Sequence, residues 1–164
     1  MDRALLEATA AKLVAPGKGI LAADESNPTM TKRLEGVGME SSAEARRQYR
    51  ANLFATPGCE QAISGVILFD ETIKQKTTLG LTIPELILKH GSIPGIKVDK
   101  GAKSLAGSSE ETVTEGLDGL RERLQEYYNL GARFTKWRAV YKISNESPSI
   151  QSIKSNAHAL ARYA

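Results

Sequence analysis

Charged residues stand within or at the ends of the short apolar segments of this sequence, where a buried strand should not tolerate them. Lys97 and Asp99 are two residues apart, as are Lys136 and Arg138, so each pair lies on one face of an extended strand. Asp24 ends another apolar segment. Like-charged neighbours and desolvation lower the pKa of a lysine, which suits it to proton transfer or amine chemistry, and the same cations hold phosphate groups. The pattern therefore indicates a site that binds phosphate and moves protons.

Each of these residues could instead serve structure alone, for example as an interior ion pair between Lys97 and Asp24. For a single residue the two interpretations are equally acceptable. Asp70 and Glu71, which follow a further apolar segment, add carboxylates to the same region. A buried charge without a purpose costs several kcal/mol, which favours function for the set as a whole.

Four apolar segments must position these residues, each followed by a polar loop and a helical stretch. The second of them is rich in Val, Ile and Leu and almost uninterrupted, which is typical of a strand buried on both faces of a parallel sheet. Strands that alternate with helices favour right-handed βαβ units, whose ligands bind beyond the carboxyl ends of the strands. We expect parallel strands in chain order at residues 19–24, 63–69, 95–99 and 134–143.

A doubly wound sheet is the structural alternative. Its dinucleotide-binding form requires a glycine-rich turn after the first strand, and residues 23–27 contain no glycine.

Capping signals and apolar periodicity delimit the helices. Ser41 and Glu44 have the spacing of a capping box, as do Thr82 and Glu85. Ser147 is expected as the N-cap of the last helix, with a proline at its first position. The expected helices are an amphipathic one within residues 1–15, then 41–56, 83–90, 114–130 and a final one from residue 148.

Composition bounds the class of protein. The 164 residues, 41% hydrophobic and 25% charged, suit a single globular domain but are few for an eight-stranded barrel, which typically needs about 250. The net charge of +3 does not argue for nucleic acid or for an anionic membrane surface. One cysteine, Cys59, excludes an internal disulfide. Without a long apolar stretch or a signal peptide, we expect a cytoplasmic protein.

Several polar residues give weaker signals. Ser26, Thr29 and Arg33 follow the first strand and could contact phosphate, but from the residues alone an ordinary helix start with capping side chains is the preferred explanation. Arg46 and Arg47 lie on an expected helix and by default face solvent. The spacing of His, Cys and Asp residues suggests no metal site.

Five segments together make the sequence resemble class I fructose-bisphosphate aldolase. The match runs in order along nearly the whole chain, from about Lys18 to Ala164. The segments are KGILAADES at 18–26, SGVILFDET at 64–72, PGIKVDKG at 94–101, EGLDGL at 115–120 and FTKWRAV at 134–140.

The resemblance implies an α/β fold of the TIM (β/α)8 class, with about the first four β/α units present. It implies cleavage of fructose 1,6-bisphosphate to glyceraldehyde 3-phosphate and dihydroxyacetone phosphate through a lysine Schiff base, without a cofactor or metal. Asp24 and Lys136 match catalytic residues of the family. Matching substrate-binding residues, several of them for phosphate, are Ser26, Thr29, Arg33, Arg46, Lys97 and Arg138.

The sequence departs from the family pattern at two points. Thr29 stands where the animal enzymes are expected to have serine, which keeps a hydroxyl. The family's Schiff-base lysine and its acid/base glutamates belong to the sixth and fifth strands, which have no counterpart in this sequence. Because residues 160–164 still read as helix, we expect a chain truncated at its C-terminus.

Two hypotheses about function remain. Either the chain is part of a longer aldolase, or it is a short product that does not catalyse and acts only as a sugar-phosphate binder or assembly partner. The family commonly forms homotetramers, and we expect an isolated half-barrel to associate with itself.

Overall fold

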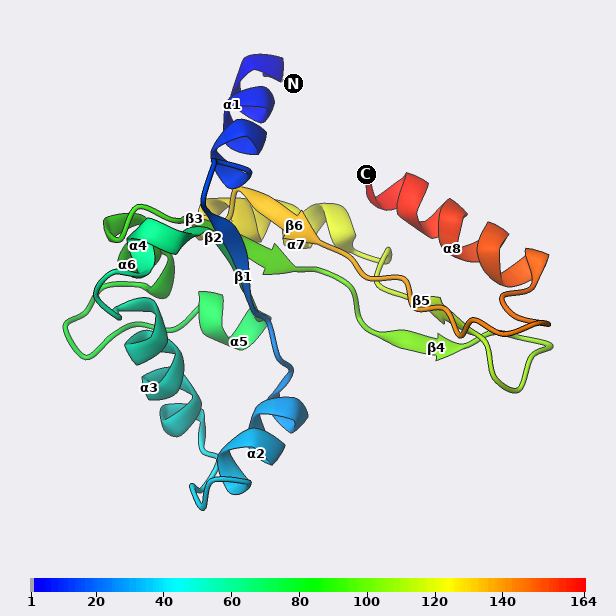
Figure 1. Ribbon diagram of the computed structural model, residues 1–164, viewed down its shortest axis with the longest axis horizontal. Helices are drawn as coiled ribbons and strands as arrows, with labels where there is room; N and C mark the ends of the chain where they lie inside the picture. Colours follow the sequence, from blue (N-terminus) through cyan, green and yellow to red (C-terminus); the bar gives the residue numbers. More distant parts are fainter. Residues whose placement is uncertain (1) are drawn as a thin grey trace. The chain divides into compact units, whose positions relative to one another are not determined.

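The computed structural model describes residues 2–164, whose helices and strands are labelled in Figure 1. They form two compact units. The first comprises Met1–Lys97 and Glu126–Thr135, and the second comprises Val98–Gln125 and Lys136–Ala164. Each unit is described by itself below, and a single domain over residues 1–164 stays a prediction.

A parallel sheet of four strands confirms the predicted strand order. The sheet runs β1-β2-β3-β6, in the order of the chain. β1 pairs in parallel with β2, and β2 with β3. The amide of Arg133, just before β6, donates to the carbonyl of Pro94 at 2.8 Å. The strands are β1 (Gly19–Ala23), β2 (Ile63–Leu68), β3 (Ile93–Lys97) and β6 (Phe134–Lys136).

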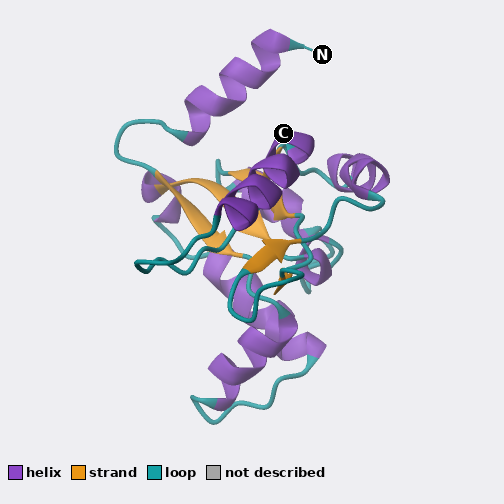
Figure 2. Cartoon of the chain, turned by 90° about the vertical axis from the view of Figure 1, so that its right-hand side faces the viewer, coloured by secondary structure: helices purple, strands orange, loops and turns teal. Residues whose placement is uncertain are grey.

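The fourth strand is much shorter than predicted. Residues 137–149 contain neither helix nor strand, so the predicted strand at 134–143 is wrong beyond residue 136; the stretch is drawn as loop in Figure 2. Its carbonyls accept hydrogen bonds from side chains in place of a ladder. The hydroxyl of Thr114 donates to the Arg138 carbonyl at 2.7 Å, and that of Thr112 to the Val140 carbonyl at 3.3 Å.

Helices of the first unit cover one face of its strands. Leu21 of β1 and Val66 of β2 line a small pocket together with Phe54 and Ile87, which lie on two of these helices. Val66, Leu68 and Ile96 are almost fully buried on this face. In chain order, the helices that lie wholly in this unit are α1 (Arg3–Leu13), α2 (Asn27–Glu35), α3 (Ala43–Phe54), α4 (Cys59–Ala62), α5 (Asp70–Ile73) and α6 (Ile83–Lys89). Phe54 lies on α3 and Ile87 on α6.

One predicted capping box is confirmed and the other is wrong. At α6, the Thr82 hydroxyl accepts from the Glu85 amide at 3.3 Å, and the Thr82 amide donates to the Glu85 carboxylate at 2.7 Å. At α3 the N-cap is Ser42 rather than Ser41. Ser41 cannot cap because its hydroxyl bonds to Thr31 at 2.8 Å.

The second unit contains a β-hairpin that the sequence did not predict. β4 (Ala102–Ser104) pairs in antiparallel fashion with β5 (Thr112–Thr114). The helix predicted at 114–130 is wrong over its first residues: Gly116 and Gly119 have positive φ angles of 133° and 63°, and α7 (Leu120–Asn129) begins only after them.

The last helix, α8 (Ile150–Tyr163), begins two residues later than predicted. Its N-cap is Ser149, whose hydroxyl accepts from the Ser152 amide at 3.1 Å. The predicted cap Ser147 fails because its amide and carbonyl both bond to Ser144. Within the described residues, no helix combines the length and apolar character that crossing a membrane requires.

Candidate functional site

Asp24 and Lys97 project from one face of the first unit's strands. The strand register pairs Ala22 with Ile67, and Ile67 with Gly95. Paired residues of parallel strands project to the same side, and sides alternate along a strand. Asp24 and Lys97 stand two residues beyond Ala22 and Gly95, so both lie on the face opposite the one that α3 and α6 cover. This is the carboxyl end of β1 and β3.

The segment after β1 presents hydroxyl groups. Ser26 occupies the N-cap position of α2, but its side chain makes no capping hydrogen bond. Its hydroxyl lies 3.2 Å from that of Thr29, which is exposed. The Ser26 side chain therefore does not cap α2, contrary to the explanation preferred from the residues alone. Ser26 is half-buried and Thr29 is exposed.

Arg33, on α2, pairs with the carboxylate of Glu25. Its side chain is 58% exposed, whereas that of Glu25 is 15% exposed. The guanidinium therefore carries donors at the surface, where an anion can reach them.

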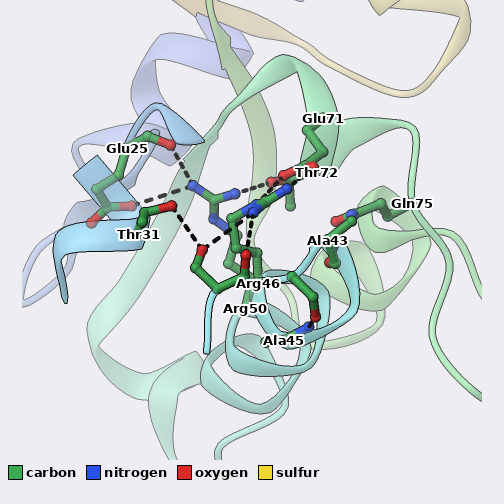
Figure 3. Close-up of polar contacts among 11 residues, drawn as sticks. Glu25, Thr31, Ala43, Ala45, Arg46, Arg50, Glu71, Thr72 and Gln75 are labelled. Atoms are coloured by element: carbon green, nitrogen blue, oxygen red, sulfur yellow. Dashed lines mark hydrogen bonds and ion pairs between the residues drawn. The ribbon is translucent and has the colours of Figure 1, made fainter. Parts of the chain in front are cut away.

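Arg46 makes a two-point contact with Glu71 at the start of α5 (Figure 3). Its Nε and Nη2 donate to the two carboxylate oxygens at 2.8 and 2.6 Å, and its Nη1 donates to the Ser41 hydroxyl at 3.2 Å. With its side chain 11% exposed, Arg46 does not face solvent, so the default expectation is wrong. The hydrogen bonds from Arg46 hold the pKa of Glu71 below its usual value. The same hydrogen bonds to Glu71 raise the pKa of Arg46.

Arg47, the neighbour of Arg46, bonds to Glu44 and to the carbonyl of Lys76 and is also half-buried. The expectation that it faces solvent is therefore wrong as well.

Arg50, one turn beyond Arg46, was not identified from the sequence. It is fully buried, and its guanidinium reaches both Thr72 and the backbone of Glu25. The sequence does indicate that Arg50 is buried. Arg46, Arg50 and the apolar Phe54 are spaced by four residues, so they share one face of the helix.

Lys136 and Arg138 belong to the second unit. Lys136 is the last residue of β6, and its carbonyl accepts from the Val98 amide at 3.0 Å. The backbone of Arg138 is held by Thr114 of the hairpin. Their convergence with Asp24 and Lys97 stays a prediction. Among residues 2–164, no three His, Cys, Asp or Glu side chains are grouped closely enough to hold a metal ion.

The second unit is tied together by Asn156 of α8. Its Oδ1 accepts from the Thr114 amide at 3.1 Å, and its Nδ2 donates to the Thr112 carbonyl at 2.9 Å. Trp137 stacks on Tyr163 with ring centroids 5.4 Å apart. These contacts hold α8 against β5 and against Trp137, the residue before Arg138.

Comparison with known proteins identifies the family. Residues 5–164 match the family model described as "Glycolytic: Fructose-bisphosphate aldolase class-I". The chain is 60% identical over 159 residues to the probable fructose-bisphosphate aldolase class 1 of Xanthomonas campestris, covering 97% of this chain and 48% of that protein. It is 52% identical over 156 residues to the cytosolic fructose-bisphosphate aldolase 7 of Arabidopsis thaliana, covering 95% and 44%.

A solved structure also resembles the chain. It is fructose-bisphosphate aldolase from Plasmodium falciparum, in complex with TRAP and a small-molecule inhibitor. The TM-score is 0.95 at 49% sequence identity, over 98% of this chain and 47% of that one. The chain spans about half the length of the curated relatives it matches. The chain belongs to the class I fructose-bisphosphate aldolase family.

Proposed function

We propose that this chain supplies about the first four β/α units of a TIM-barrel aldolase that reversibly cleaves fructose 1,6-bisphosphate. The observation that carries the proposal is the position of Asp24 and Lys97 on the sheet face that α3 and α6 leave uncovered, at the carboxyl ends of their strands. In barrels of this class that end is where the reacting groups gather. The family match over residues 5–164 supports the same assignment.

The reaction requires a lysine that lies beyond this chain, on the sixth strand of such a barrel. Its amine attacks the C2 carbonyl of the sugar, and loss of water gives an iminium. The iminium accepts the electrons of the C3–C4 bond while the C4 hydroxyl loses its proton, which releases glyceraldehyde 3-phosphate. Protonation of the remaining enamine and addition of water then free dihydroxyacetone phosphate and the lysine.

In these reaction steps the residues of this chain supply positive charge and transfer protons. Lys136 and Asp24 handle protons around the carbinolamine and the Schiff base. Lys97 and Arg138 offset the negative charge of the substrate. Its phosphates are held by Ser26, Thr29, Arg33 and Arg46, of which Arg33 offers an exposed guanidinium. For Arg46, a phosphate would replace the bonds of Nη1 to Ser41, the longest ones it makes.

We propose a cytosolic location and a homotetrameric whole protein, in keeping with the family. The second candidate function is a half-barrel that binds sugar phosphate or assembles with another chain without catalysis. It is favoured by one observation, that the chain matches about half the length of its relatives.

The test joins residues 1–164 to the second half of the Xanthomonas campestris relative; this fusion is called the joined protein below. We expect it to cleave fructose 1,6-bisphosphate in a coupled assay. Lys136→Met and Asp24→Asn should each reduce kcat/KM at least about 100-fold, the usual contribution of a proton-transferring group. Lys142→Met is the matched control, since Lys142 is an exposed partner of Glu110. A folded joined protein without cleavage would favour the non-catalytic candidate.

A further inference from the structure

Arg50 links the segment after β1 to α5 through a single buried guanidinium. Its side chain is 0% exposed. Nη1 donates to the Thr72 hydroxyl at 2.6 Å, and Nη2 donates to the backbone carbonyl of Glu25 at 2.5 Å. The Glu25 carboxylate lies 3.7 Å from Nη2. Figure 3 shows the guanidinium between these partners.

Burying the charged guanidinium of Arg50 costs desolvation free energy. Its Nε has no hydrogen-bond partner among the described residues. Burial lowers the pKa of Arg50, a shift that the charge of Glu25 opposes. An apolar side chain of similar volume would often be as stable or more so. What an apolar residue could not do is hold Thr72 and the Glu25 carbonyl in one fixed geometry.

The carbonyl that Arg50 holds belongs to the segment at residues 24–26. These residues lie in neither strand nor helix, between the end of β1 and the start of α2. The Glu25 carbonyl separates Asp24 from Ser26 along the backbone. This carbonyl belongs to the peptide group that joins Glu25 to Ser26. A bond to it therefore fixes the plane from which Ser26 extends directly, and it restrains Asp24 through the Cα of Glu25.

We propose that Arg50 is a positioning residue for Asp24 and Ser26. By anchoring the Glu25 carbonyl to α5, it fixes the positions of both side chains relative to the substrate. The part of this inference that concerns substrate rests on the proposed function. Arg50 itself is buried beneath the segment and acts through it.

The surrounding ion pairs keep both anchors in place. Arg46 and Glu71 join α3 to α5 one turn from Arg50, so Thr72 is held next to a second fixed point. Arg33 pairs with the Glu25 carboxylate from α2. The segment is thus bonded from α2 through a side chain and from α3 through its backbone. A displacement of about 1 Å at reacting groups can reduce a rate about 100-fold.

The experiment replaces Arg50 in the joined protein with methionine, which fills the volume without donors. Arg47→Met is the control: Arg47 is on the same helix and half-buried, but it bonds to Glu44 and to the carbonyl of Lys76. Two readouts are taken well below each variant's unfolding midpoint, namely kcat with KM for fructose 1,6-bisphosphate and the amide hydrogen exchange of residues 24–30.

We expect Arg50→Met to reduce kcat about 100-fold and to accelerate exchange in residues 24–30. Arg47→Met should change neither. A role in stability alone would lower the midpoint for unfolding but leave kcat at lower temperature untouched. A kcat for folded Arg50→Met equal to that of Arg47→Met would therefore overturn the inference.

Thr72→Val supplies a second variant if Arg50→Met does not fold, since it removes only the acceptor on α5. It should reduce kcat and accelerate the same exchange, and wild-type values for both would overturn the inference. Failure of the proposed function has a different signature, because the unmutated joined protein would then not cleave the sugar. In that case exchange alone decides: acceleration in residues 24–30 by Arg50→Met and not by Arg47→Met supports the anchor, and equal exchange removes it.

Discussion

The ring of Phe134 lies against the backbone of Gly95. A Cβ atom added at Gly95 would stand 2.4 Å from the ring's Cζ, closer than real carbon atoms approach. Gly95→Ala should therefore destabilise the joined protein by about 1–3 kcal/mol, the usual effect of overfilling a packed site. Urea unfolding measures the difference.

Two further variants make that prediction specific. Gly19 is in β1 with nothing within 4 Å of its added Cβ, so Gly19→Ala should leave stability unchanged or slightly raised. Phe134→Ala should remove part of the destabilisation when it is combined with Gly95→Ala. Equal midpoints for Gly95→Ala and the parent would mean that the ring does not rest on this glycine.

The pair of Arg46 and Glu71 should make stability depend on pH. The pKa of Glu71 is lowered in the folded protein, so its contribution is complete above the unfolded value of about 4.3 and is lost as pH falls through the lower folded value. We expect Glu71→Gln to cost about 1–3 kcal/mol at pH 7. The difference from wild type should shrink at acid pH.

Glu44 provides the comparison for that titration. Hydrogen bonds from Arg47 lower the pKa of Glu44 to about 2, but this carboxylate is exposed, where an ion pair contributes little. Glu44→Gln should therefore matter less than Glu71→Gln at pH 7 in urea unfolding. A larger loss for Glu44→Gln, or a loss for Glu71→Gln that does not change with pH, would contradict the assignment.

The 164-residue chain by itself should not cleave fructose 1,6-bisphosphate. In the proposed mechanism the iminium forms on a lysine of the sixth strand, which has no counterpart among these 164 residues. Borohydride treatment with dihydroxyacetone phosphate should leave its mass unchanged, whereas the joined protein should gain a stoichiometric adduct. An adduct on Lys97 or Lys136 of the isolated chain would show that a lysine of this half replaces the missing one.

Sequence predicts this fold best where a single local signal has no competitor. The uninterrupted run at β2 and the capping box at Thr82 were both identified correctly, because strand burial and helix capping each depend on neighbouring residues. The start of α7 was not, since apolar periodicity continued through Gly116 and Gly119, whose positive φ angles prevent a helix there. The hairpin of β4 and β5 is missed because its strands are only three residues long and residues 105–111 between them lack the Asn-Gly or Asp-Gly pair that marks a tight hairpin turn.

The polar cluster around Arg50 shows the same division. The family resemblance assigns Arg33 and Arg46 to substrate phosphate, but the sequence does not predict which residues they contact in the folded chain. Glu71 lies 25 residues from Arg46 in the sequence, and only the folded chain brings the two together. The default of solvated arginines on a helix failed because the partners in this case are other parts of the same chain.

If this chain is the first half of an aldolase barrel, as proposed, it should associate with the second half when that half is added as a separate polypeptide. Ile20 and Ala22 are exposed on the sheet face that carries Asp24, and the outer edge of β1 is unpaired within the described sheet. Exposed apolar surface beside an open strand edge favours association. We therefore expect the 164-residue chain alone to be aggregated or self-associated.

Size-exclusion chromatography with light scattering, followed by an aldolase assay of each fraction, gives the answer. We expect the two polypeptides to elute as a discrete complex and this fraction to cleave fructose 1,6-bisphosphate. A monodisperse monomer with a sharp cooperative melt, to which the second half neither binds nor restores activity, would contradict it.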